Sequence, residues 1–204
     1  MSVVSGKRLC EMLASGELFV SPILNSEQIG PASIDLRLGP IAYTARTRNV
    51  SHVSPARYRN SGLEGEVAKQ QKLDRYEVPF GTNIVIHAGR LTLVPSLEWV
   101  HLPSNLLGVV TARSTWAREG LSIATATFIQ PGYRGIITLE LANLGPVPIE
   151  LYPGMRIAQI AFFEVTGKER PNAGQFDLSF EPKAGYLKDD ELYFVRNRSS
   201  NPID

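Results

Sequence analysis

The sequence is poor in the residues that bind metals and cross-link chains. Its 204 residues include one cysteine, Cys10, and three widely separated histidines, His52, His87 and His101. A single cysteine excludes an internal disulfide framework and is typical of a reducing compartment. Because no Cys-x-x-Cys or His-x-Glu pair occurs, zinc chemistry is unsupported, and we expect no metal ligated by protein side chains.

Several common functional signatures are also missing. There is no Walker-type or dinucleotide-binding glycine motif and no nucleophile elbow of a serine hydrolase. No apolar run is long enough to span a bilayer, and the first residues lack the apolar region of a secretory signal. The formal net charge is +1, so any anion binding must come from local clusters. We expect a cytoplasmic protein that binds neither nucleic acid nor membrane.

What is present predicts a single, mainly β domain over residues 1–204. Fourteen prolines and seventeen glycines favour many turns. Ser5 and Gly16 are suited to begin and end a short N-terminal helix over residues 5–15. Short apolar runs between turn residues predict an antiparallel sandwich or barrel, with strands at 84–87, 91–94, 106–111, 121–128, 135–143, 147–151 and 155–165.

The remaining segments carry weaker patterns. Residues 31–39 alternate apolar and polar side chains, which predicts a half-buried strand. Residues 44–75 are polar and predict a long loop or insertion. The segment from residue 166 is also polar, although residues 192–195 are suited to one more strand.

Glu140 is an acid inside an apolar strand pattern. Alternation places Ile137, Leu139 and Leu141 on one face and Glu140 on the other, with Thr138. If that second face is desolvated, the pKa of Glu140 rises and the side chain is suited to proton transfer near neutral pH. A solvent-facing glutamate on a one-sided antiparallel strand explains the same pattern.

Two arginines and two hydroxyls lie within six residues just upstream. Arg113 and Arg118 offer planar donor groups suited to phosphate, and Ser114 and Thr115 add neutral donors. An ordinary turn with surface arginines explains these residues equally well.

These residues also form motifs of a known family. The segment 113–121, Arg-Ser-Thr-Trp-Ala-Arg-Glu-Gly-Leu, resembles the Arg-Ser-Ser-x-Ala-Arg-x-Gly-Leu signature of dCTP deaminases. Further matching blocks occur in order at 28–39, 125–126, 129–141 and 153–159. The resemblance covers about residues 5–165.

The resemblance implies a fold, an assembly and a reaction. The fold is a dUTPase-like β-barrel or distorted jelly roll, and the assembly is a homotrimer whose active sites are shared between subunits. The reaction is hydrolytic deamination of dCTP to dUTP and ammonia, in which Mg2+ accompanies the triphosphate and no zinc takes part.

The same resemblance assigns roles to individual residues. It makes Glu140 the general base and acid, with Ser114 and Arg118 holding the attacking water and stabilising charge near the base. Arg113 and Thr115 bind triphosphate oxygens. The other substrate-binding positions are Ala126 at the cytosine edge, Gln130 at the 3′-hydroxyl, Tyr133 under the deoxyribose, and Gln159. Asp35 and Arg37 are assigned to structure or to the trimer interface.

The sequence departs from the family pattern at four places. Gln130 replaces an aspartate whose counterpart in dUTPases helps to activate water, and an amide cannot act as a base. Thr115 replaces a serine, and one residue is deleted between Leu121 and Thr125. The family's tail motif has no clear match, and Lys183, Tyr186 and Lys188 are candidate substitutes for it.

Three hypotheses follow for the function. The first is deamination of dCTP or a related cytosine nucleotide. The second is dUTP diphosphohydrolysis, alone or combined with deamination, and Gln130 counts against it. The third is a non-catalytic family member that binds a nucleotide or a partner protein.

Overall fold

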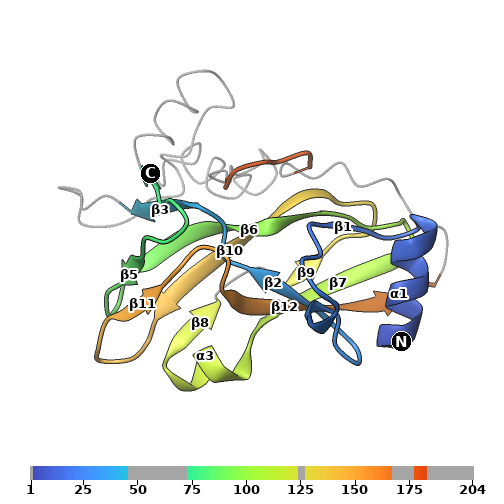
Figure 1. Ribbon diagram of the computed structural model, residues 1–204, viewed down its shortest axis with the longest axis horizontal. Coiled ribbons are helices and arrows are strands. Elements are labelled where there is room, and N and C mark those ends of the chain that lie inside the picture. The colour runs from blue at the N-terminus through green and yellow to red at the C-terminus, as the bar shows by residue number, and fades with distance from the viewer. Residues whose placement is uncertain (1, 46–72, 124–126, 167–176, 183–204) are drawn as a thin grey trace, which may run out of the picture. The chain divides into compact units, whose positions relative to one another are not determined.

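The computed structural model describes residues 2–45, 73–123, 127–166 and 177–182 (Figure 1). Contacts divide the chain into two compact units, Met1–Thr44 with Arg75–Lys183, and Ala45–Asp74 with Ala184–Asp204. The described residues fall almost wholly in the first unit. A single domain over 1–204 therefore stays a prediction, and the strand expected at 192–195 lies outside the described residues.

The N-terminal helix forms where its end signals predict it. Helix α1 spans Gly6–Ser15, and the Ser5 hydroxyl accepts a hydrogen bond from the Arg8 N–H at 3.4 Å. At the other end Gly16 has φ +76°, which favours glycine, and its N–H donates to the Leu13 carbonyl. Leu9 and Met12 are buried, so one face of α1 joins the core.

Two sheets account for most of the strands. The larger has six strands, β1 (Phe19–Ser21), β3 (Ile41–Ala45), β4 (Leu73–Glu77), β6 (Leu91–His101), β8 (Leu121–Ile123) and β10 (Arg134–Asn143), in the order β4-β3-β6-β10-β8 with β1 also on β6. The smaller has the order β2 (Ile34–Arg37), β12 (Arg156–Glu164), β7 (Leu106–Ala112), β9 (Phe128–Ile129). A separate pair joins β5 (Ile84–Ile86) to β11 (Ile149–Leu151).

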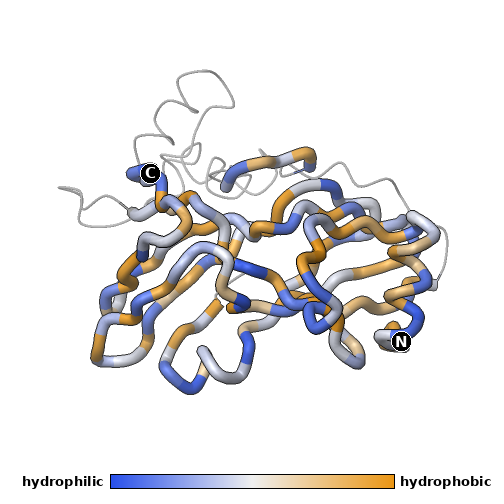
Figure 2. Tube along the Cα trace, viewed as in Figure 1, coloured by the Kyte–Doolittle hydropathy of each residue, from blue (hydrophilic) through white to orange (hydrophobic). Residues whose placement is uncertain are grey.

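One hydrophobic cluster joins the two larger sheets. Alternate side chains of β6 and β12 are buried, and Figure 2 shows hydrophobic and polar positions alternating along the strands. The core contains Val94 and Val100 from β6 together with Ile160 and Phe162 from β12. The mainly β fold with a short N-terminal helix is therefore confirmed. Its described strands form open sheets that do not close into a barrel.

Several predicted boundaries differ from the structure. Strand β6 continues to His101 instead of ending before Pro95, because the β10 ladder shifts register opposite this region and a bulge accommodates proline. The single strand predicted at 121–128 is β8 at one end and β9 at the other. The edges of the predicted loop 44–75 belong to β3 and β4, and 46–72 lie outside the described residues.

Within the described residues, two short helical turns were not predicted. The 3-10 helix η1 spans Ser26–Gln28, and the five-residue helix α3 spans Ser114–Arg118. In the part of the chain that the structure describes, no helix is long and apolar enough to cross a membrane.

Candidate active site

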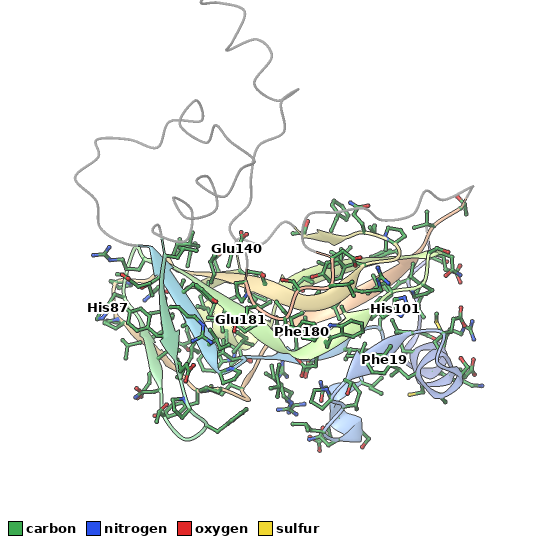
Figure 3. The ribbon with its side chains drawn as sticks, turned by 90° about the horizontal axis from the view of Figure 1, so that it is seen from above. Phe19, His87, His101, Glu140, Phe180 and Glu181 are labelled. Carbon is green, nitrogen blue, oxygen red and sulfur yellow. The ribbon has the colours of Figure 1, made fainter. Side chains whose placement is uncertain are left out.

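Glu140 lies on the outer, half-buried face of β10. Ile137, Leu139 and Leu141 are buried on the opposite face, as the alternation predicts. Glu140 pairs in register with Leu93 of β6, and Figure 3 shows its side chain projecting from the sheet. Partial burial withdraws water from the carboxylate and raises the pKa of Glu140 above its ordinary value of 4.5. This acid is therefore partly desolvated and yet reachable, as proton transfer requires.

The Arg113 segment is fixed by main-chain contacts to β12. The Arg113 N–H donates to the Ile157 carbonyl at 3.0 Å, and the Trp116 indole N–H donates to the Arg156 carbonyl at 3.2 Å. Between these anchors Ser114 and Thr115 open helix α3 with exposed side chains. Residues 114–118 therefore form a short helix that is anchored to β12 at two points, and they are not an ordinary surface turn.

A tight glycine turn connects α3 to the strand beside Glu140. Gly120 has φ +89°, and a Cβ there would lie 2.8 Å from the Gly145 nitrogen, so both conformation and space require glycine. The chain then enters β8, whose Ile123 pairs with Leu141 of β10. This route connects the Arg113–Arg118 segment to β8, the strand that pairs with the Glu140 strand.

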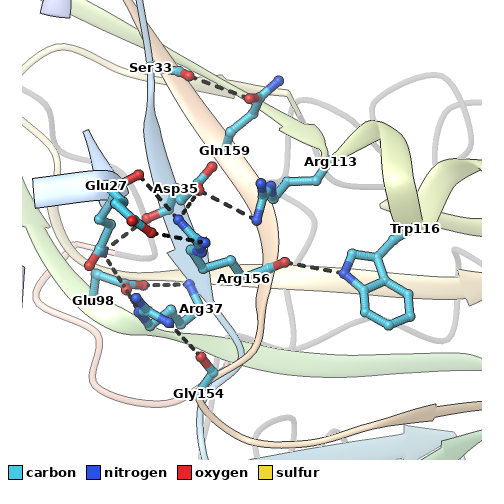
Figure 4. A network of polar contacts seen from close by, with 11 residues as sticks. Glu27, Ser33, Asp35, Arg37, Glu98, Arg113, Trp116, Gly154, Arg156 and Gln159 are labelled. Carbon is cyan, nitrogen blue, oxygen red and sulfur yellow. Dashed lines mark hydrogen bonds and ion pairs between the residues drawn. The ribbon is translucent and has the colours of Figure 1, made fainter. Parts of the chain in front are cut away.

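Arg113 also takes part in an ion cluster on the smaller sheet (Figure 4). Its Nη1 lies 3.5 Å from Oδ2 of Asp35, and Nη1 of Arg156 lies 3.3 Å from the same oxygen. Arg156 also donates to the Glu27 carbonyl at 3.2 Å and lies 3.9 Å from the Glu27 carboxylate. Asp35 is expected to have a structural role or to lie at the trimer interface, and nothing in the sequence singles out Arg156, because the alternating pattern around Asp35 gives no sign of its partners.

A second polar cluster lies deeper, around Glu98 of β6. The carboxylate is fully buried and accepts hydrogen bonds from the Gln28 amide and the Arg37 main-chain N–H, both at 2.8 Å. The Arg37 guanidinium lies 4.0 Å away. Burial raises the pKa of Glu98 to about 7, although these donors oppose the rise. The assignment of Arg37 to structure or to the trimer interface stays a prediction.

The other predicted substrate residues occupy varied environments. The Tyr133 hydroxyl donates to the Ile136 carbonyl at 2.5 Å, and burial together with Asp177 raises its pKa to about 12. Gln159 donates to Thr111 at 3.3 Å on the smaller sheet. Gln130 is exposed at the turn before β10. Ala126 and the tail candidates Lys183, Tyr186 and Lys188 lie outside the described residues.

A C-terminal segment, residues 177–182, is tied to the larger sheet without any motif that predicts it. Asp177 pairs with Arg134 of β10 at 2.7 Å, and Leu178 donates its N–H to the Arg134 carbonyl. At its other end Glu181 pairs with Arg75 of β4 at 3.1 Å and accepts a hydrogen bond from Tyr43 of β3. The segment therefore connects strands on both sides of β6, in the region labelled by Phe180 and Glu181 in Figure 3.

Comparisons with known proteins match most of this chain. A model of the dCTP deaminase-like family matches residues 3–165. A dCTP deaminase, dUMP-forming, from Methanosphaera stadtmanae is 32% identical over 197 residues, which cover 93% of this chain and 96% of the relative. A dCTP deaminase from Halorubrum lacusprofundi is 36% identical over 165 residues, covering 80% and 77%.

A solved structure shares the fold. The 2′-deoxycytidine 5′-triphosphate deaminase from Agrobacterium tumefaciens superimposes with a TM-score of 0.59 at 23% identity. The match covers 78% of this chain and 46% of that longer chain.

Proposed function

The chain belongs to the dCTP deaminase-like family, and on that premise we propose that it deaminates dCTP to dUTP and ammonia. The observation that carries the proposal is the position of Glu140. A partly desolvated carboxylate lies on β10, next to the strand that leads from the Arg113–Arg118 segment. The hydroxyl and cationic groups of α3 precede β8, and β8 pairs with the Glu140 strand, so one connection links the acid to the groups assigned to hold water and charge.

In the proposed step, Glu140 moves protons while water replaces the amino group. The carboxylate takes a proton from water as the water oxygen bonds to C4 of cytosine. The protonated acid then gives this proton to N3. Glu140 next takes the proton of the C4 hydroxyl and gives it to the amino nitrogen, so that the C4=O bond forms as the C4–N bond breaks and ammonia leaves. Burial raises the pKa of Glu140, which makes its carboxylate a stronger proton acceptor than that of an ordinary exposed glutamate. Ser114 and Arg118 hold the water and stabilise the developing charge.

The triphosphate is assigned to Arg113 and Thr115. The Arg113 side chain is 34% exposed, so its guanidinium remains accessible to an anion beside Asp35. Mg2+ enters as part of the substrate, bound to the triphosphate. Among the described residues, no group of three or more histidine, cysteine, aspartate or glutamate side chains is suited to hold a metal ion.

A second candidate activity follows from the relatives. The Methanosphaera stadtmanae protein, which matches 93% of this chain, is described as dUMP-forming. Such an enzyme adds a second hydrolysis, in which water attacks the α-phosphorus and pyrophosphate leaves. Gln130 is exposed at the turn where the resemblance places an acid that activates this water, and its amide accepts no proton at neutral pH. We therefore propose deamination without hydrolysis of the triphosphate as the leading activity.

One assay separates these activities. Purified protein with Mg2+ and dCTP is expected to release ammonia and dUTP without pyrophosphate. Ammonia with pyrophosphate and dUMP would instead establish the dUMP-forming activity. Nucleotide binding with neither product would make the chain a non-catalytic member of its family.

We further propose that the protein is a homotrimer in which Arg113 and Thr115 act across a subunit boundary. We also propose that it is a cytoplasmic protein. Molar mass from light scattering tests the assembly. A monomer that deaminates dCTP would show that one chain holds the complete site.

A further inference from the structure

We propose that Asp35 is a positioning residue that orients Arg113 toward the substrate phosphates, and that Arg156 keeps this pair cationic. The inference rests on the proposed function, because it concerns the phosphate half of the same site. Its starting observation is the convergence of two guanidinium groups on one carboxylate oxygen, Oδ2 of Asp35, at 3.5 and 3.3 Å.

The three side chains come from elements with fixed backbones. Asp35 lies on β2, where it pairs with Gln159 of β12, and Gln159 pairs in turn with Thr111 of β7. Arg113 follows the end of β7 and is bonded through its N–H to Ile157. The carboxylate is 13% exposed, so its position is set by the sheet rather than by solvent. A flexible arginine held against such an anchor loses less conformational freedom when a ligand binds.

Charge explains why two arginines are needed. A single aspartate beside a single arginine forms a neutral pair that attracts phosphate weakly. Here Arg113 and Arg156 share Asp35, so the trio retains one positive charge. Glu27 contacts Arg156 at 3.9 Å, but its side chain is 78% exposed and its charge is therefore screened by water. The cluster therefore combines a fixed orientation with a net attraction for an anion.

Removing the Asp35 charge distinguishes positioning from simple electrostatics. Asp35→Asn makes the site more positive, so a purely coulombic role predicts tighter binding of the anionic substrate. Positioning predicts the opposite, because Arg113 loses the group that orients it. We expect the KM for dCTP to rise roughly tenfold, which corresponds to the loss of one charge-assisted contact, with kcat within about twofold of wild type.

Two controls isolate the effect. Glu27→Gln removes the same charge from the same cluster without touching Arg113, and it should leave KM unchanged or slightly lower. In an Arg113→Gln background, itself raised in KM, Asp35→Asn should add no further increase. A structural role for Asp35 would instead lower kcat and the melting temperature in both backgrounds.

The outcomes separate the two levels of the proposal. A KM that falls or stays constant in Asp35→Asn, or that rises equally in the Arg113→Gln background, would overturn the positioning role while deamination by the wild type stands. If Asp35→Asn fails to fold, Arg156→Gln provides the second measurement, because removing the charge that keeps the trio cationic must raise KM if the inference holds. A wild-type chain that neither binds nor deaminates dCTP would overturn the proposed function, and this inference with it.

Discussion

Two glutamates lie on adjacent strands of the larger sheet and differ in almost every physical respect. Glu98 on β6 faces the core, is fully buried, and has its carboxylate occupied by Gln28 and the Arg37 backbone. Glu140 on β10 faces outward and is half-buried. Burial raises the pKa of both carboxyl groups, to about 7 for Glu98.

The difference shows that a raised pKa does not by itself identify a catalytic acid. A fully enclosed carboxylate can exchange no proton with a substrate, whereas a half-buried one can. Glu98 connects β6 to β2 and to the Gln28 segment, so its role is to hold the two sheets together. Glu140 lies on the strand that pairs with β8, the strand after α3, and its proposed role there is proton transfer.

Replacing Glu140 should reduce activity and replacing Glu98 should reduce stability, and the largest effect is expected for Glu140. Glu140→Gln is expected to lower kcat for dCTP deamination by about 10³-fold or more, because it removes the proton acceptor. The melting temperature, the molar mass and dCTP binding should stay close to wild type. Residual turnover above one-tenth of wild type would show that another group moves the proton.

Glu98→Ala should act on stability instead. It leaves the Arg37 main-chain N–H and one of the two Gln28 amide hydrogens without an acceptor, and it removes the carboxylate beside the Arg37 guanidinium. We expect the free energy of unfolding at pH 8 to fall by about 3 kcal/mol, measured by urea denaturation. The kcat of the folded fraction should change less than about threefold. A large kcat loss with unchanged stability would reverse the roles assigned to the two acids.

The two acids also predict opposite responses to pH. In the unfolded chain Glu98 titrates near 4.5, and in the folded chain near 7, so between these values the folded state holds a proton that the unfolded state has lost. The free energy of unfolding should therefore fall as pH rises from 4.5 to 7, by up to about 3 kcal/mol, and level off above 7. Asp177 and Glu181, whose pKa values are lowered by their arginine partners, act below this window.

Activity should rise over the range in which stability falls. Glu140 must be ionised to accept a proton, and its raised pKa moves the acid limb of kcat/KM above pH 4.5. Urea denaturation and initial rates on the same samples from pH 4.5 to 8 measure both trends. In Glu98→Gln the dependence of the free energy of unfolding on pH should largely disappear, while the pH profile of kcat/KM stays unchanged. If both pH dependences change in this variant, the titrations of Glu98 and Glu140 are not independent.

The smallest effect is expected from Gln28→Leu. The Gln28 amide donates to Glu98 at 2.8 Å and to the Asp35 carbonyl at 3.0 Å. Losing this side chain should lower the free energy of unfolding by roughly 1–2 kcal/mol. Because the ionised Glu98 carboxylate loses a donor, the pKa of Glu98 should rise further, and the fall in stability with pH should continue to higher pH. The acid limb of kcat/KM should not move. A shift in that limb would indicate coupling between Gln28 and the active site.

Local patterns predicted much of the fold. Ser5 and Gly16 marked the ends of α1, and alternation in Ile137, Leu139 and Leu141 gave the core face of β10. Pro95 misled the prediction of β6, because whether a proline ends a strand or sits at a bulge depends on the partner strand. The open edges of the sheets were likewise not predictable, because barrel closure depends on pairing between distant strands.

The candidate site was predictable where it lies in one continuous motif. Arg113, Ser114, Arg118 and Glu140 all fall within 28 residues of sequence. Asp35 and Arg156 lie far from that motif in the chain, and their proximity to Arg113 depends on the β2–β12–β7 ladders. No local pattern contains that information.

The sequence by itself determined the β-rich class, the N-terminal helix and the family motifs, because these depend on side-chain period, cap chemistry and residue type over short stretches. By side-chain period alone Glu98 and Glu140 are indistinguishable, since each is an acid between apolar neighbours in a strand, and only the family motif singles out Glu140. Only the tertiary structure decided which of them is enclosed and which stays within reach of solvent. The physical reason is that desolvation and hydrogen-bond partners come from neighbouring strands, and strand neighbours are set by long-range pairing rather than by local sequence.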